Sequence, residues 1–229
     1  MQYKDILERL KSLANPEAVK GMARYGITAE RNYGVSMPKL TELAKEIGRD
    51  HLLAQQLWDA GIRETRILAA MVDDPGLVTE DQMEQWVKDF DSWEVCDQCC
   101  MKLFKRTKFA YAKAVEWSAR SEEFVKRAGF VLMACLTVND KKADDREFLK
   151  FLPLIKREAR DNRTFVKKSV NWALRQIGKR NRALNEMAIK TAKEIQQSST
   201  SAKWIASDAI RELTSDAVQK RLRGRELSL

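Results

Sequence analysis

What the sequence lacks excludes several large classes of protein. Its 229 residues include one histidine, four cysteines, nine glycines and four prolines. It has no glycine-rich phosphate loop, no His-Glu-x-x-His motif and no Gly-x-Ser-x-Gly turn. These absences argue against most nucleotide-binding enzymes, zinc enzymes and serine hydrolases. If the chain performs chemistry, we expect a carboxylate to perform it, with arginine and tryptophan around it.

Long hydrophobic runs are also absent. The first eight residues alternate charged and apolar side chains, unlike a secretory signal peptide. No stretch approaches the roughly 20 apolar residues that a transmembrane helix needs. We therefore expect a cytoplasmic, nucleoid-associated protein, or a nuclear one if the cell has a nucleus, with no membrane partner.

The four cysteines are Cys96, Cys99, Cys100 and Cys135, and they stand among apolar or helix-forming residues. The Cys96-x-x-Cys99 spacing fits a redox pair or half of a metal site. Zinc would need two more ligands, and the single histidine, His51, is far away in sequence. We favour the alternative of buried, reduced thiols that fill helix contacts, and we expect no metal and no cofactor.

Charge is distributed unevenly along the chain. The net charge is +9, but residues 1–140 hold 20 Lys/Arg against 22 Asp/Glu, whereas residues 141–229 hold 22 against 11. This asymmetry fits a polyanionic partner for the C-terminal half. A soluble basic surface without such a partner explains the composition equally well.

Helical periodicity runs through almost the whole sequence, and no alternating strand pattern occurs. We expect an all-α fold with breaks at Asn15-Pro16, Met37-Pro38, Asp73–Gly76 and Asn139-Asp140. The expected helices span residues 2–13, 37–47, 50–59, 63–73, 79–89, 92–106, 109–119, 122–138, 145–160, 163–180, 183–197 and 201–214.

The helices resemble one another at a fixed interval. The segment from Phe124, Phe-Val-Lys-Arg, returns 41 residues later as Phe-Val-Lys-Lys from Phe165. A period near 40 with two helices per unit is typical of HEAT or armadillo repeats, although a generic helical bundle stays possible. We predict one HEAT-like solenoid domain over 1–229, whose second helices line a concave basic groove that contains Arg127 and Lys168.

The segment 163–182 carries seven Lys or Arg residues and no acidic residue. Its apolar stripe of Val166, Val170, Ala173 and Ile177 predicts one buried face, and Trp172 falls on the opposite, cationic face. An aromatic ring there can meet a sugar or base beside a phosphate backbone. We expect general phosphate contacts from five cations of this segment: Lys167, Lys168, Arg175, Lys179 and Arg180.

A second segment could carry chemistry. Asp91 or Ser92 can cap a helix in which Trp93 and Asp97 lie four residues apart, hence on one face. Such a pair can be a plain surface contact, can bind a neighbouring helix, or can form the anionic part of a site.

Taken together, these motifs resemble the AlkD-type DNA alkylation-repair glycosylases. The resemblance begins at Tyr25-Gly-Ile27 and Val35-x-Met-Pro-x-Leu40, continues through Leu57-Trp58 and Ser92-Trp93-x-x-x-Asp97, and extends into the repeats after residue 200. The family's functional residues match Trp93, Asp97, Arg127 and Trp172, in that order. The chain departs from the family's Trp-Asp-x-Val-Asp pattern, because it has Trp-Glu-Val-Cys-Asp at 93–97.

The resemblance implies a HEAT-like repeat that cradles duplex DNA and removes N-alkylated purines such as 7-methylguanine or 3-methyladenine. It implies that Asp97 stabilises the oxocarbenium-like sugar and orients or deprotonates water. Trp93 and Trp172 would bracket the sugar, and Arg127 would hold a flanking phosphate. We expect a monomer that contacts mainly the DNA backbone.

Other interpretations stay open at this stage. Trp172 can instead pack between repeats, and Arg127 can instead pair with a neighbouring carboxylate. The protein can bind damaged or branched DNA without catalysis, or act as a protein-interaction scaffold, and only the DNA-binding alternatives predict salt-dependent DNA affinity. His51 is expected to start a helix without a functional role. We interpret the remaining tryptophans as core residues: Trp58, Trp86, Trp117 and Trp204.

Overall fold

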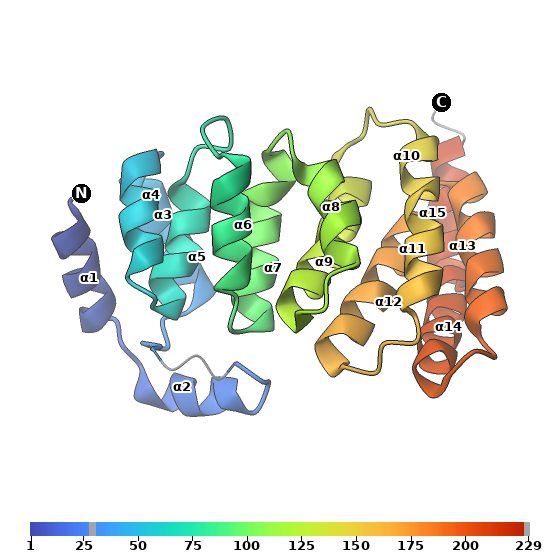
Figure 1. The fold of residues 1–229 in the computed structure, drawn as a ribbon, viewed down its shortest axis with the longest axis horizontal. Coiled ribbons are helices and arrows are strands. Elements are labelled where there is room, and N and C mark those ends of the chain that lie inside the picture. Colours follow the sequence, from blue (N-terminus) through green and yellow to red (C-terminus); the bar gives the residue numbers. More distant parts are fainter. Residues whose placement is uncertain (28–30, 227–229) are drawn as a thin grey trace. The chain divides into compact units, whose positions relative to one another are not determined.

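The chain folds entirely into helices where the structure describes it. This computed structural model describes residues 1–27 and 31–226, which form fifteen α-helices, one short 3₁₀ helix and no strand (Figure 1). The predicted all-α class is confirmed. The chain divides into two compact units, Met1–Phe109 and Ala110–Leu229, which are described separately. The single domain over 1–229 stays a prediction.

The first unit contains helices α1 to α7. Within it α3, α5 and α7 contact one another in succession and form one layer, while α4 packs against α5. The indole rings of Trp58 and Trp86 stack at 4.0 Å between centroids and join α4 to α6. Its elements are α1 (Tyr3–Ser12), α2 (Pro16–Ala23), α3 (Met37–Ile47), α4 (His51–Asp59), α5 (Arg63–Val72), α6 (Glu80–Lys88), α7 (Trp93–Lys102) and η1 (Phe104–Arg106).

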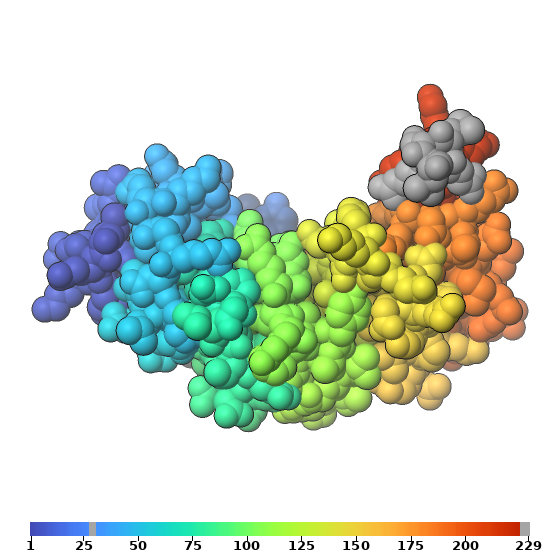
Figure 2. Space-filling view, turned by 90° about the horizontal axis from the view of Figure 1, so that it is seen from above, coloured from blue at the N-terminus to red at the C-terminus, as the bar shows by residue number. Residues whose placement is uncertain are grey.

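The second unit contains helices α8 to α15. Here α9, α12 and α14 contact in succession, and α8, α11 and α13 form a second layer in the same order. The sequence colours of this unit accordingly change in order across its surface (Figure 2). Its elements are α8 (Ala110–Ser118), α9 (Glu123–Asn139), α10 (Asp145–Leu149), α11 (Phe151–Glu158), α12 (Thr164–Gly178), α13 (Arg182–Ile195), α14 (Thr200–Leu213) and α15 (Asp216–Glu226).

The 41-residue repeat has a direct structural counterpart. Phe124 and Phe165 are both the second residue of their helices, α9 and α12, and their rings pack 5.6 Å apart. Equivalent side chains thus meet where one repeat stacks on the next. Gly129 lets α8 and α9 approach closely, since a Cβ atom there would lie 2.5 Å from the backbone nitrogen of Ser118.

The expected list of helices differs from the structure at four places. The expected break at Asn15-Pro16 is present, since α1 ends at Ser12, but we expected no helix after it, whereas Asn15 caps α2 and Pro16 fits its first turn, where no N–H is needed. The expected helix 145–160 is two helices, because Pro153 cannot donate the backbone bond that would continue α10 into α11. The expected helix 92–106 ends at Lys102 and tightens into η1. The expected series stopped before α15.

Candidate functional site

The start of α7 presents Trp93 and Asp97 on one face. Ser92 caps the helix, and its Oγ accepts the backbone N–H of Val95 at 3.4 Å. The partly exposed indole of Trp93 donates its N–H to the carbonyl of Tyr25 at 2.9 Å, which fixes the ring. Asp97 follows one turn later and is only 7% exposed. The helix therefore holds a carboxylate in a largely dry place beside an anchored aromatic ring.

A buried ion network secures this helix start. Arg63, the first residue of α5, binds the carboxylate of Glu94 with two bonds of 2.6 and 2.8 Å. Its Nη1 also donates to Glu64 at 2.8 Å and to the Val35 carbonyl at 3.2 Å. Burial lowers the pKa of Arg63, but the bonds and charges of Glu94 and Glu64 outweigh it and raise the pKa. Glu94 is thus committed to structure.

The three thiols of α7 lie in the core. Cys96, Cys99 and Cys100 are 0% exposed. Burial raises the pKa of Cys99, and the neighbouring charges of Cys96 and Asp73 raise it further. A thiol held protonated is a poor nucleophile and a poor metal ligand. Residues 1–27 and 31–226 contain no disulfide and no cluster of three metal-ligating side chains.

His51 begins α4, as expected. Its Nδ1 lies 2.6 Å from the buried carboxylate of Asp73, which also accepts a bond from Gln82. This contact ties the helix start to the end of α5.

Arg127 lies in the second turn of α9 and is 6% exposed. Its Nη1 donates to the carbonyl of Phe165 at 2.7 Å, near the start of α12. This bond orients the guanidinium along the contact between the two helices.

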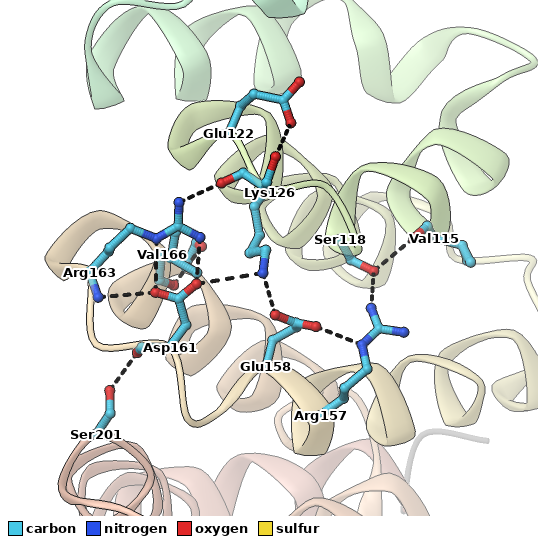
Figure 3. Close-up of polar contacts among 12 residues, drawn as sticks. Val115, Ser118, Glu122, Lys126, Arg157, Glu158, Asp161, Arg163, Val166 and Ser201 are labelled. Atoms are coloured by element: carbon cyan, nitrogen blue, oxygen red, sulfur yellow. Dashed lines mark hydrogen bonds and ion pairs between the residues drawn. The ribbon is translucent and has the colours of Figure 1, made fainter.

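A second buried ion network supports α9 and α12. The ammonium of Lys126 lies between two carboxylates, 2.5 Å from Glu158 and 3.6 Å from Asp161 (Figure 3). Asp161 also binds Arg163, the residue that precedes α12, and its backbone carbonyl accepts the hydroxyl of Ser201 at 2.6 Å. Burial raises the pKa of Asp161, but Arg163 and Lys126 outweigh it and lower the pKa.

The predicted core stripe of α12 is confirmed. Val166, Val170, Ala173 and Ile177 are each 0% exposed. Trp172 lies outside this stripe and is partly exposed. Its indole N–H donates to the side-chain oxygen of Gln176 at 2.9 Å when the amide is oriented to accept it.

The five predicted phosphate contacts separate into two groups. Lys168 is exposed, and neither Lys167 nor Lys168 forms an ion pair within the described chain. By contrast, Arg175 and Lys179 both bind Glu212 of α14. Arg180 donates to the carbonyls of Thr137, Asp140 and Ala143, at 2.8 to 2.9 Å. Phosphate binding by these five cations stays a prediction, but three of them hold the fold together.

Three residues of α12, spaced one helical turn apart, contact α14. Lys167 Nζ lies 5.1 Å from the ring centre of Trp204, and one turn later Asn171 donates to the Ile205 carbonyl at 3.2 Å. Arg175, another turn on, meets Asp208 and Glu212. Of the face that we expected to meet solvent, Arg175 and Lys179 thus contact α14, whereas Lys168 is exposed and Trp172 is partly exposed.

Three of the four tryptophans expected in the core are buried: Trp58, Trp86 and Trp117. The expectation for Trp204 is wrong, because 42% of this residue is exposed. Its helix buries Ile205 and Ala206 instead, and the indole projects beside Lys167.

The structure brings together some of the predicted site residues. Trp93 and Asp97 share α7 in the first unit, whereas Arg127 and Trp172 lie on adjacent helices of the second. Sequence reasoning missed the role of Arg63 and Lys126. The sequence signal for these pairs is weak. Each cation lies within the first four residues of a helix, and its carboxylate partner lies two helices later.

Comparisons with known proteins fit this architecture. The model of a family described as "DNA alkylation repair enzyme" matches residues 6–213. No curated protein matches the chain. A solved structure described as "A new family of proteins related to the HEAT-like repeat DNA glycosylases with affinity for branched DNA structures" has a TM-score of 0.77 and 19% identity, covering 93% of this chain and 95% of the other. The predicted HEAT-like repeat fold is confirmed, while the basic concave groove stays a prediction.

None of the helices within residues 1–27 and 31–226 combines the length and apolar character needed to cross a membrane.

Proposed function

Because the chain belongs to the DNA alkylation repair enzyme family, we propose that it is a DNA glycosylase that removes cationic alkylpurines from duplex DNA. The substrates are bases such as 7-methylguanine and 3-methyladenine, and the reaction is hydrolysis of the N-glycosidic bond. The observation that carries this proposal is the largely buried carboxylate of Asp97, one turn from the anchored indole of Trp93.

The chemistry demands little of the protein. A purine alkylated at N3 or N7 already carries positive charge and leaves without a general acid. The deoxyribose becomes oxocarbenium-like as the bond breaks, so a fixed carboxylate in a site shielded from water lowers the barrier. We assign this role to Asp97 on the family motif, and Arg63 already neutralises the neighbouring Glu94. In our proposal Asp97 also orients or deprotonates the attacking water.

The other three residues act on the DNA around the reacting sugar. The faces of Trp93 and Trp172 attract the developing positive charge of the sugar. Arg127 holds a flanking phosphate by a charge-assisted, forked contact. Lys167 and Lys168 add general attraction for the backbone. The protein works as a monomer in this proposal.

The direct test uses duplex DNA that contains a single 7-methylguanine. We expect the protein to convert this position into an abasic site, scored by strand cleavage in alkali. Protein that binds the duplex but releases no base over many hours would exclude the enzyme.

Asp97→Asn tests the assignment of the carboxylate. The change keeps the shape but removes the charge, so we expect about a 10²- to 10³-fold slower release of 7-methylguanine. Asp81→Asn is the matched control, because Asp81 is an exposed carboxylate of α6. Unfolding and duplex affinity are measured alongside. Equal rates for Asp97→Asn and the unaltered protein would rule out Asp97 as the catalytic group.

A second candidate is DNA binding without excision. The similar solved structure is described as having affinity for branched DNA, which favours this alternative. It predicts tight, salt-dependent binding of a four-way junction together with intact 7-methylguanine.

A further inference from the structure

Trp204 is an exposed aromatic residue beside a positive charge. It lies on α14 of the second unit and is 42% exposed, although large apolar side chains nearby in its helix are buried. The ammonium of Lys167 lies 5.1 Å from its ring centre. Lys167 thus covers part of the ring, and the rest is open to a ligand.

The position of Trp204 in its helix matches that of the predicted site residues. Asp97 is the fifth residue after the N-cap of α7, and Arg127 and Lys168 are the fifth after those of α9 and α12. Trp204 is the fifth after Ser199, the N-cap of α14. In α5 the position holds the buried Ile67, so the series of polar or aromatic residues begins at α7. Within the second unit α9, α12 and α14 stack in succession, and equivalent positions of stacked repeats can serve one binding surface.

The surroundings of Trp204 carry unpaired positive charge. Within the described residues, no carboxylate pairs with Lys167, Lys168 or Lys203, the residue next to Trp204. The equivalent of Lys167 in the preceding repeat, Lys126, is paired with two carboxylates.

The carboxylates near this cluster are engaged elsewhere. Asp161 lies two residues before the N-cap of α12, and the uncharged Gln197 takes that place before α14. Glu194 pairs with Lys156 at 3.0 Å. Asp208, one turn beyond Trp204, binds Arg175 and Arg211. The lysines around Trp204 therefore retain their charge for an anionic ligand.

We propose that Trp204, with Lys167 over its ring and with Lys168 and Lys203 next to these two residues in the sequence, is a stacking platform for an unpaired base of DNA. Inside a duplex both faces of a base are covered by its neighbours, so an exposed indole cannot stack on an internal base pair, whereas an unpaired base at a fork, flap or branch offers it a free face. Aromatic stacking on such a base contributes about 1–3 kcal/mol, and the lysines hold the adjoining phosphates. The inference rests on the proposed function in taking DNA as the ligand, but it needs no base excision.

The experiment compares two DNAs in fluorescence anisotropy: a blunt duplex, and the same duplex with three unpaired nucleotides on each strand at one end. We expect the unaltered protein to prefer the forked DNA. Trp204→Ala should reduce the ratio of forked to blunt affinity by about tenfold, as expected for the loss of one stacked base. Trp204→Phe should keep most of the preference, because it retains a ring.

Met187→Ala is the matched control, since Met187 of α13 is exposed to a similar extent, 41%. Its ratio should equal that of the unaltered protein. Absence of a fork preference, or a preference that survives in Trp204→Ala, would overturn the inference. Protein that shows the Trp204-dependent preference but releases no 7-methylguanine would overturn only the proposed glycosylase.

Discussion

The two units of the molecule use their cations differently. The first unit has 16 Lys/Arg and 18 Asp/Glu, and its most buried cation, Arg63, lies inside a network with Glu64 and Glu94. The second unit has 26 Lys/Arg and 15 Asp/Glu. Its carboxylates can neutralise only part of this charge, so lysines such as Lys168 remain exposed. The carboxylate proposed for chemistry, Asp97, thus lies in the balanced unit, and the excess positive charge lies in the other.

The contrast between Lys126 and Lys167 sharpens this point. Both are the fourth residue after an N-cap, in neighbouring repeats. Lys126 lies between Glu158 and Asp161 and is buried, whereas Lys167 lies over the ring of Trp204 and has no carboxylate partner among the described residues. The same residue type at the same position holds the fold in one repeat and is available to a ligand in the next. The residues around each lysine, and not its charge, determine which of these two roles it has.

The largest effect should come from breaking the network of the first unit. Arg63→Ala leaves Glu64 and Glu94 buried without their cation, so we expect the free energy of unfolding to fall by about 3–5 kcal/mol. Denaturant unfolding measures this loss. Lys88→Ala, at an exposed residue of α6, is the control and should change stability by less than about 0.5 kcal/mol.

The same variant has a diagnostic partner. Adding Glu94→Gln to Arg63→Ala removes one of the two buried negative charges that have lost their cation. The double variant should therefore recover part of the lost stability. A loss below about 1 kcal/mol for Arg63→Ala, or no recovery in the double variant, would contradict a structural role for the network.

An intermediate effect should separate the two groups of cations in α12. Arg180→Ala removes three bonds to carbonyls, so we expect about 2–3 kcal/mol of lost stability and an unchanged salt dependence of DNA binding. Lys168→Ala should leave stability within about 0.5 kcal/mol and lower the slope of log affinity against log salt by about 1. Identical behaviour of the two variants would remove the distinction.

The smallest effect should appear as the pH falls. Burial raises the pKa of Glu212, but bonds from Lys179 and Arg175 outweigh it and hold the pKa below the ordinary 4.5. A carboxylate with a lowered folded pKa stabilises the fold above its unfolded pKa, and this contribution disappears as the pH falls through the folded pKa. Denaturant midpoints of the protein should therefore decline below about pH 4.5, and less steeply in Glu212→Gln.

The sequence predicted the parts of this fold that depend on periodicity. The buried stripe of α12 and the 41-residue repeat follow from spacing, and both are present. The family follows from motif order. Spacing does not determine which residue of another helix a polar side chain contacts. The sequence predicted that Arg175 and Lys179 face solvent, but in the structure both bind Glu212 of α14.

Trp204 and the short terminal helices show a second limit. A large apolar side chain is expected in a core, yet α14 fills its buried face with small residues and Ile205, and the indole stays outside. Asn15-Pro16 reads equally as a break or as a helix start, and α15 has little apolar periodicity to identify it. The roles of Asp97, Arg127 and Trp172 remain predictions from the family motif.

The shared fifth position after the N-cap has a consequence for how such repeats can vary. One residue inserted into a connecting loop lengthens the loop and leaves every helix as it was. The same residue inserted between the cap and the fifth position turns that side chain by about 100° around the helix axis and sends it towards a neighbour. Loop lengths can therefore drift freely between relatives, while the number of residues in the first turn and a half cannot. In our proposals, the lysine at this position of α12 meets a phosphate and the tryptophan at this position of α14 meets an unpaired base.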